Sequence, residues 1–304
     1  MNNLLKNLSI IIPLAPEENA WENLWQDLKD LPEQIEIILV GPQKPENHLP
    51  DRIKWIDSEL GRARQLNCGA RAATKDFLWF LHADSRFTPK TIPALANSLK
   101  NHPNHLHYFN LRFLPDGSPL MFINEIGCWI RSKWMKLPFG DQGFCVSKEV
   151  FEFIGAYPED VSYGEDHVFV WRARQLGIKL RSTRCALKTS ARKYRAQGWS
   201  KITRLYYKLW TKQAAPEKRM LHKIRSGQTT AVATFVKTPG ISPLKTRLAK
   251  EIGEESAINF YNLSLNAIRN VLKAAEQESQ KTLKPYWAVA EKQALGTSEW
   301  EGFS

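Results

Sequence analysis

Cysteine and long apolar runs are both scarce in this 304-residue sequence. The four cysteines are widely spaced and include no C-x-x-C pair, which excludes a disulfide-rich scaffold and gives no pattern for a zinc site. No run approaches the roughly eighteen apolar residues that a membrane-spanning helix needs. The start, MNNLLKNLSIIIP, also lacks the layout of a signal peptide. We therefore expect a cytoplasmic protein whose cysteines are small buried hydrophobic residues.

Acidic residues are nearly missing from one stretch of the chain. Between Val168 and Gly227 there are seventeen Lys and Arg residues and one acid, Glu217, and the whole chain has a net charge of +12. Such a surface attracts anions. Three interpretations stay open for the helix expected after Arg195: a packed helix with a solvated basic face, a membrane-surface helix, or nucleic-acid contact. Peripheral contact of residues 195–225 with the inner face of a membrane is one of these, and we expect no specific nucleic-acid binding.

Short apolar runs alternate with helical patterns through the first part of the chain. Strands are predicted at residues 8–12, 35–40, 53–56, 77–81 and 107–113 and around Cys145. Helices are predicted at residues 21–31, 61–73, 89–100, 120–134 and 148–154 and from Glu165 onward. This alternation implies an α/β fold with a mostly parallel sheet flanked by helices.

The helix predicted at 120–134 has an apolar side, which we expect to face the core. That side consists of Ile123, Ile126, Cys128, Ile130 and Trp134. Trp129 and Met135 are expected to be partly exposed.

The stretch FLWFLHADS, residues 77–85, ends a buried apolar run on an acid. Ligands of parallel sheets gather at the carboxyl ends of strands. If the chain stays extended, His82 and Asp84 point together and Ala83 points away. That geometry could hold a metal bound to a diphosphate. The alternative is that Asp84 is only a turn or cap residue.

Arg62 and Arg64 open a helix directly after a strand, where side-chain charge and free backbone N–H groups favour an anion such as a diphosphate. A solvated basic helix face is the alternative. Asn67 and Gly69 are unusual in a helix interior and predict the close approach of another segment. Farther on, KTSARKYR, residues 188–195, has four cations that would suit a phosphate clamp.

Glu165 and Asp166 lie where a glycine-bearing loop enters a helix, so free N–H groups and the helix dipole stabilise an ionised carboxylate there. Asp166 could be a general base that removes a proton from an acceptor hydroxyl. A plain helix start is the alternative. The loop with Asp141 and Gln142 is polar between apolar flanks, as binding loops are, although a simple turn would look the same.

Taken in order, several motifs resemble family 2 glycosyltransferases of the GT-A fold. The matching stretches are LSIIIP, GRARQLNCGA, FLHADSR, FGDQGFCVS, YGEDHVFVWR and KTSARKY. Their wording resembles a bacterial subfamily named for arsenosugar biosynthesis and associated with radical SAM and selenodomain proteins. The resemblance extends from about Leu8 to about Ile224, and it implies a Rossmann-like, mostly parallel sheet that binds a nucleotide-diphosphate sugar.

The resemblance implies transfer of a sugar from a nucleotide-sugar donor to an acceptor hydroxyl, with inversion at the anomeric carbon and a divalent cation, Mg²⁺ or Mn²⁺. Asp84 corresponds to the last acid of the family's DxD metal motif, and His82 replaces its first acid. Asp166 corresponds to the catalytic base, next to Glu165. The expected donor-binding residues are Pro13, Arg62, Arg64, Asn67, Ala83, Asp84 and Arg192. Asp141 and Gln142 are expected on the acceptor side.

One position departs from the family pattern. After the second strand these enzymes usually have an Asp in a DGGS or DGSS turn, where it helps to hold the nucleotide base. This chain reads VGPQKPEN from Val40 and places Gly41 there. A degenerate transferase-fold scaffold therefore stays an alternative function, as does an anionic-surface binder for membrane or nucleic acid.

The tail is predicted to be a separate, incomplete α/β segment. Strands are predicted at 231–236 and 285–290, with a helix starting in LKTRLAKEIG and another at 259–275. The tail resembles the opening of a companion transferase subfamily with its own GT-A-like domain. We therefore predict a transferase domain at 1–226 and a partial second domain at 227–304. So small a unit would bury little core alone, so we expect it to pack on the first domain or on another chain.

Overall fold

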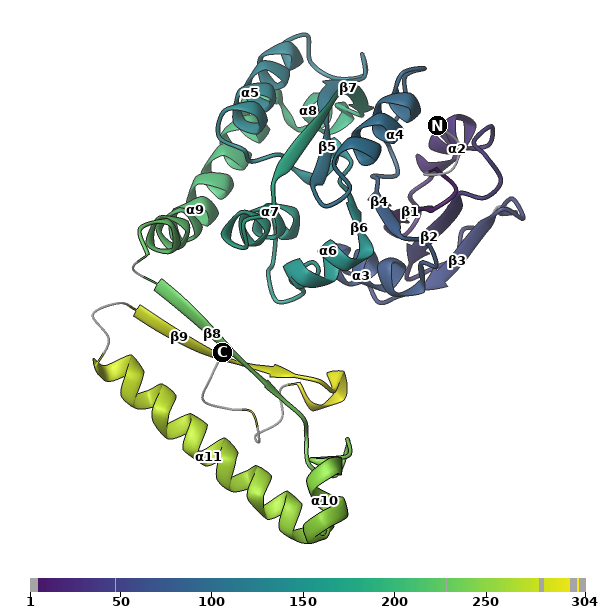
Figure 1. Cartoon of the computed structure of the whole chain (residues 1–304). Helices are drawn as coiled ribbons and strands as arrows, with labels where there is room; N and C mark the ends of the chain where they lie inside the picture. Colours follow the sequence, from purple (N-terminus) through teal and green to yellow (C-terminus); the bar gives the residue numbers. More distant parts are fainter. Residues whose placement is uncertain (1–4, 47, 228, 279–281, 296–299, 301–304) are drawn as a thin grey trace. The chain divides into compact units, whose positions relative to one another are not determined.

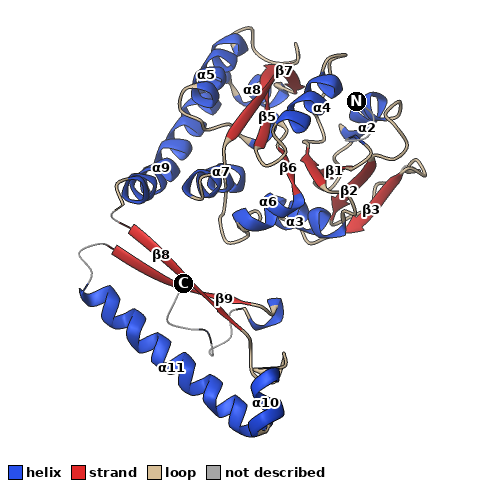
Figure 2. Ribbon diagram, viewed as in Figure 1, coloured by secondary structure: helices blue, strands red, loops and turns tan. Residues whose placement is uncertain are grey.

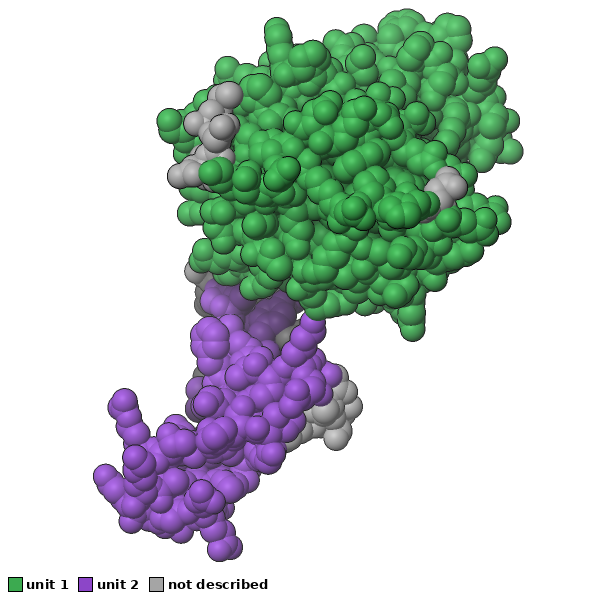
Figure 3. Space-filling view, turned by 90° about the vertical axis from the view of Figure 1, so that its right-hand side faces the viewer, with its two compact units in different colours: residues 1–218 green, residues 219–304 purple. Residues whose placement is uncertain are grey.

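The computed structural model describes residues 5–46, 48–227, 229–278, 282–295 and 300. The chain forms two compact units, residues 1–218 and 219–304 (Figure 3). This division lies inside one long helix, α9 (Trp199–Arg225), eight residues before the predicted boundary. The assignment of these parts as two transferase-type domains stays a prediction.

Seven strands form one sheet in the first unit (Figure 1). They are β1 (Leu8–Pro13), β2 (Glu36–Gly41), β3 (Ile53–Asp57), β4 (Phe77–Phe80), β5 (Leu106–Phe113), β6 (Cys145–Ser147) and β7 (Leu180–Thr189). Their order is β3-β2-β1-β4-β6-β5-β7, and all neighbours are parallel except at β6, which is antiparallel to both β4 and β5. The predicted α/β class with a mostly parallel sheet is confirmed.

Helices cover both faces of this sheet, with α3 and α6 on one face and α2 and α4 on the other (Figure 2). The helices of the first unit are α2 (Trp21–Leu28), α3 (Arg62–Ala72), α4 (Thr91–Asn101), α5 (Met121–Lys133), α6 (Lys148–Ile154), α7 (Glu165–Gln175), α8 (Arg192–Gln197) and α9. A single 3-10 turn, η1 (Gly140–Gln142), precedes β6. Each helix predicted above is present, with ends that shift by a few residues.

The core follows the alternation of the strands. Ile10 and Ile12 of β1 pack in the cluster that contains Leu24 of α2. Ile11 points to the other face, where α3 lies so close that a Cβ atom on Gly69 would come within 2.5 Å of Ile11 Cγ2. Only a glycine allows this contact without a shift. The close approach predicted from Gly69 is confirmed.

The prediction that the apolar side of α5 faces the core is wrong. Ile123, Ile126, Ile130 and Trp134 are between 44% and 72% exposed. Polar residues occupy the inward side instead: Glu125 accepts a hydrogen bond from the backbone N–H of Phe113 at 2.8 Å, and buried Ser132 hydrogen-bonds Gln142. These bonds fix the helix with its apolar side outward. The predicted partial exposure of Trp129 and Met135 is confirmed.

The second unit is a small α/β element with its own core. Strands β8 (Thr229–Val236) and β9 (Thr282–Val289) are parallel neighbours joined through α10 (Thr246–Ile252) and α11 (Glu254–Glu278). Val236, Leu265 and Trp287 belong to its buried cluster. The predicted strand–helix–strand order is confirmed. In the part of the chain that the structure describes, no helix is both long and apolar enough to cross a membrane.

Candidate active site

The sheet topology gathers several of the predicted residues at one edge. The strand order reverses between β1 and β4, and ligands of such sheets bind at the carboxyl ends on either side of that point. Because β6 is antiparallel, its amino end points the same way as the carboxyl ends of β4 and β5, and Cys145 pairs with Trp79 near the end of β4. The residues after β4, the turn η1 before β6 and the end of β7 therefore come to the same edge.

Asp84 lies just after β4, within a turn in which the backbone N–H of Ser85 donates to the carbonyl of His82 at 3.1 Å. Its carboxylate accepts a hydrogen bond of 3.1 Å from the hydroxyl of Thr189, at the end of β7. Burial raises the pKa of Asp84, and the hydrogen bond from Thr189 opposes that rise. Asp84 is thus a turn residue, but its side chain is bound by another strand.

The predicted shared direction of His82 and Asp84 is wrong, because the chain leaves the extended conformation at Ala83. The ring Nε2 of His82 contacts the guanidinium of Arg62 on α3, whereas Asp84 accepts a hydrogen bond from Thr189. Burial, and then the nearby Arg62 charge, lower the pKa of His82 well below its usual value, so the ring is neutral.

Arg62 connects two elements of this edge. Besides His82, it contacts Glu165 at the first position of α7, with 2.9 Å between Nε and Oε1. Burial raises the pKa of Glu165, as does the neighbouring Asp166, while Arg62 opposes the rise. Helix α7 begins at Glu165, as predicted, after Gly164 at a left-handed φ of 67°. Arg62 thereby holds the acidic pair near the end of β4.

Asp166 is held by two backbone donors. The N–H of Gly140 donates to its Oδ2, and the N–H of His167 donates to its Oδ1 at 2.8 Å. Gly140 lies so close that a Cβ atom there would be 3.1 Å from both Cβ and Oδ2 of Asp166. The acidic pair at the start of α7 and the turn η1 therefore form one unit.

Asp141, also in η1, has a carboxylate oxygen that is buried and has no hydrogen-bond partner among the described residues. Its pKa is raised to about 6, first by burial and then by the nearby charges of Asp166 and Asp84, while Arg131 opposes the rise. Three carboxylates from three different elements therefore influence one another here.

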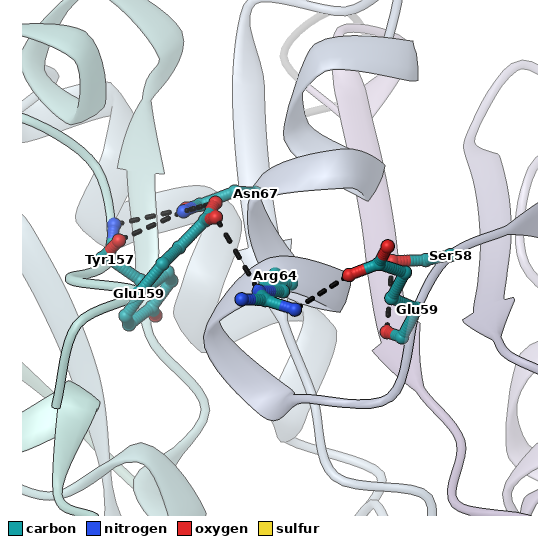
Figure 4. Close-up of polar contacts among 6 residues, drawn as sticks. All are labelled: Ser58, Glu59, Arg64, Asn67, Tyr157 and Glu159. Carbon is teal, nitrogen blue, oxygen red and sulfur yellow. Dashed lines mark hydrogen bonds and ion pairs between the residues drawn. The ribbon is translucent and has the colours of Figure 1, made fainter. Parts of the chain in front are cut away.

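Two predicted site residues make hydrogen bonds within the protein through their side-chain amides. The Asn67 amide donates to the carbonyl of Tyr157 at 2.8 Å and accepts from its N–H at 3.0 Å, which joins α3 to the loop before α7 (Figure 4). Gln142 is buried, donates to the carbonyl of Phe109 at 2.8 Å and accepts from Ser132 at 2.8 Å. A direct role for either in binding substrate stays a prediction.

The other predicted donor-binding residues differ in their contacts and in their burial. Arg64 is half exposed and pairs with Glu59 at 2.6 Å and with Glu159 at 3.9 Å (Figure 4). Arg192 binds both carboxylate oxygens of Glu18, at 2.9 and 3.1 Å. The last two, Pro13 at the end of β1 and buried Ala83 after β4, offer backbone and shape rather than charge. Their donor-binding roles stay predictions.

Three residues of the site were missed by sequence reasoning. Thr189 binds Asp84, and it lies in the KTSARKY motif, which drew attention for its cations instead. Gly140 was noted only as part of a polar loop, and its need to be glycine depends on Asp166 in another element. The guanidinium carbon of Arg131 lies 3.4 Å from the centre of the Phe139 ring, and its charge lowers the pKa of Asp141. No local signal in a helix marks such an arginine.

Among the described residues of this edge, Asp84 is a suitable ligand for a divalent cation. The described residues contain no group of three His, Cys, Asp or Glu side chains that could hold a metal ion. Asp84 fits a hard cation because it is a carboxylate at a strand end, with the remaining ligands left to diphosphate oxygens and water. His82 could join only if Arg62 released its Nε2.

The structure gives a reason for glycine at position 41. It pairs in register with Asp57 of β3, and a Cβ atom there would lie 2.8 Å from Cη2 of Trp55 and 3.1 Å from the carbonyl of Leu14. A side chain at position 41 would therefore require the Trp55 ring to shift. The adjacent carboxylate of Asp57 accepts a hydrogen bond from the Trp55 indole at 2.8 Å.

Several solved structures resemble this chain, although no curated protein matches it. TarS from S. aureus is 15% identical with a TM-score of 0.48, over 60% of this chain and 36% of that one. TarS 1-349 in complex with UDP-GlcNAc is 16% identical with a TM-score of 0.47, over 60% and 58%. The mannosyltransferase PcManGT from Pyrobaculum calidifontis, in complex with GDP-Man and Mn²⁺, is 18% identical with a TM-score of 0.45, over 60% and 56%. The chain thus spans less than two thirds of each.

The match to a protein family is more direct. The family model described as glycosyl transferase family 2 matches residues 9–155. That segment runs from β1 through β6 and contains Asp84 and Asp141, while Asp166 follows it. Residues 9–155 of the first unit are therefore similar to glycosyl transferase family 2 domains.

Proposed function

We propose that this protein is an inverting, metal-dependent glycosyltransferase that moves a sugar from a nucleotide-diphosphate sugar to an acceptor hydroxyl. The observation that supports this most is the meeting of Asp84, Asp141 and Asp166 at the carboxyl edge of the sheet, within and beside the segment that matches the family. Acids at this edge suit a reaction that needs a cation ligand and a base.

Asp166 is the general base in this proposal. Its carboxylate takes the proton of the acceptor hydroxyl while the hydroxyl oxygen forms a bond to the anomeric carbon. The bond from that carbon to the diphosphate oxygen breaks, and its electron pair leaves with the nucleoside diphosphate. The N–H groups of Gly140 and His167 orient the carboxylate, so it needs little rearrangement during the reaction.

Asp141 and Arg62 assist in different ways. Asp141, which follows Gly140 in the turn η1, would orient the acceptor toward Asp166. Arg62 holds Glu165 and would offer positive charge toward the departing diphosphate. Asp84 would hold Mg²⁺ or Mn²⁺, which, when bound, stabilises the negative charge on the leaving group.

The finer parts of the proposal rest on the sequence motifs. A role in arsenosugar biosynthesis follows only from the resemblance of these motifs to that subfamily. A cytoplasmic location agrees with the four cysteines being free, as expected in a reducing compartment. Peripheral membrane contact through the basic residues 195–225, without specific nucleic-acid binding, is part of the same proposal.

The proposal is tested by a thermal-shift panel of UDP, GDP, dTDP and CDP sugars, with and without Mn²⁺, followed by titration of the best donor. Asp84→Ala should remove the Mn²⁺-dependent part of donor binding. Asp166→Asn should bind donor normally but lose about 10² to 10⁴ in kcat, because the base is gone. Asp160→Asn, an exposed acid in the loop before α7, is the matched control and should behave as wild type.

Normal transfer by both the Asp84 and Asp166 variants would contradict the proposal. Failure of every donor to bind at millimolar concentration with Mn²⁺ would favour the degenerate scaffold instead.

A further inference from the structure

Helix α5 has its polarity reversed relative to a helix that packs on a core. Its outward side contains Phe122, Ile126, Ile130 and Trp134, and Phe122 and Ile126 are each 55% exposed. A soluble surface rarely gathers so many large apolar side chains on one helix face unless something binds there. The face is therefore a contact surface.

The protein cannot hide this face by turning the helix. Glu125 is bonded to the N–H of Phe113 and to Arg112, and Ser132 is bonded to Gln142. The side-chain Oδ1 of Asn124 accepts a hydrogen bond from the Trp199 indole at 2.6 Å, and the side-chain Nδ2 of Asn124 donates to the Thr203 hydroxyl at 3.2 Å. These bonds would all break on rotation, and buried polar groups would lose their partners.

The same bonds place α9 next to α5, as Figure 1 shows. The part of α9 in the first unit, residues 199–218, contains one acid, Glu217, which accepts a hydrogen bond from Gln175. Tyr206 and Tyr207 are exposed there together with basic residues, whereas Ile202 is buried. The exposed basic residues of α5 and of residues 199–218 are Lys133, Lys201, Arg204, Lys208, Lys212 and Lys218.

We propose that the α5–α9 face, defined as the outward sides of α5 and of residues 199–218, docks onto an anionic phospholipid bilayer. Trp, Tyr and Phe side chains flanked by Lys and Arg are the composition that enters the boundary between headgroups and acyl chains. In this proposal the apolar side chains that enter the bilayer belong to α5. They lie outside the basic segment 195–225, which charge alone would predict as the membrane contact.

Charge distinguishes the bilayer from the other occupants. In a symmetric contact with a second copy, the same cations would face each other and repel, whereas anionic headgroups neutralise them. A nucleic acid would neutralise them too, but it would leave Phe122, Ile126 and Ile130 without an apolar environment. The bilayer satisfies both the charge and the apolar side chains.

The test is flotation of the full-length protein with vesicles of phosphatidylcholine alone or with about 30% phosphatidylglycerol. The wild type should float with the anionic vesicles and keep part of this binding at high salt, because apolar insertion is not screened. The double variant Trp129→Ser/Trp134→Ser should bind the anionic vesicles at least about tenfold more weakly. Phe153→Ser, which removes a 61% exposed Phe from α6, is the matched control and should float as wild type.

Because all three substituted residues are exposed, thermal melting should show that each variant is folded. Asp84→Ala should float normally, so loss of docking and loss of transferase activity are separable. The proposal is overturned if the wild type stays unbound with anionic vesicles, if the double Trp variant floats like the wild type, or if high salt removes all binding.

Discussion

Buried His107 on β5 is the side chain through which we expect the stability of the protein to depend on pH. Its Nε2 lies 2.9 Å from the carbonyl of His102, and its Nδ1 lies 2.8 Å from the hydroxyl of Ser98. A neutral ring that donates from Nε2 and accepts at Nδ1 satisfies both partners. Burial, with the nearby charges of His105 and Arg181, lowers the pKa of His107 to about 4.

We expect the free energy of unfolding to fall as pH drops from about 6.5 to about 4. The unfolded chain binds a proton at its ordinary pKa while the folded His107 stays neutral, so protonation favours the unfolded state. Above pH 6.5 both states are neutral and the effect vanishes. The loss should reach roughly 3 kcal/mol at the acid end.

Urea unfolding of His107→Gln at several pH values checks this, because glutamine cannot be protonated and should flatten the slope. His48→Gln, an exposed histidine, is the control. His105, whose pKa burial also lowers, should leave a residual slope. An unchanged slope in the His107 variant would contradict the assignment.

Gly140 determines the position of the proposed base. In Gly140→Ala the new Cβ, 3.1 Å from two atoms of Asp166, should push that carboxylate away by a few tenths of an ångström. We expect kcat to fall about tenfold with little change in the donor KM, because orientation is lost while the binding groups remain. Gly127→Ala, on α5 with nothing within 4 Å of the new methyl group, should leave both constants unchanged.

The position and role of some single residues could be predicted from the sequence, and those of others could not. Asp84 was predicted from its position after an apolar run, which is local information. The direction of His82 was wrong, because the prediction assumed an extended segment and did not find the turn that starts at Ala83. Asn67 was correctly taken as a sign of close approach, but its role as a structural link to Tyr157 could not be read from α3 alone.

At the scale of elements, strands and helices with one clear apolar period were predictable. The β1 to β4 region is an example, because alternating strands and helices allow few topologies. The short β6 was found, but its antiparallel direction was not, since a three-residue strand has no directional pattern. The α5 prediction was wrong because periodicity identifies an apolar side without saying whether it faces the core or a partner.

The β2–β3 pair supplies a prediction about Gly41. Gly41→Asp should lower the free energy of unfolding by about 1–3 kcal/mol, because its Cβ would overlap the Trp55 ring. Combining it with Trp55→Ala should cost less than the sum of the two single changes. Chemical denaturation of the four proteins in this cycle measures the coupling, and additive costs would show that Trp55 does not fill the position.

At the scale of the whole molecule, the proposed chemistry belongs to one unit. Asp84, Asp141 and Asp166 all lie before residue 219. A chain cut to residues 1–226 should therefore bind the preferred nucleotide sugar with the affinity of the full chain, measured by calorimetry. A loss of tenfold or more, with the shortened chain still folded, would show that the second unit contributes to the site.

The second unit was predicted in outline, since each of its strands and helices has a clear pattern. Its expected packing against the first unit or another chain stays a prediction. Limited proteolysis tests it: the tail should resist cleavage about as long as the first unit does. Rapid digestion of the tail around an intact first unit would contradict the prediction.

The two-stranded sheet of the second unit also has a consequence for assembly. Strands β8 and β9 pair only with each other among the described residues, so the outer edge of each strand has open hydrogen-bonding groups. Open edges accept further strands. A segment from another polypeptide could extend this sheet by backbone pairing alone, so the second unit is where we expect the chain to recruit a complementing strand.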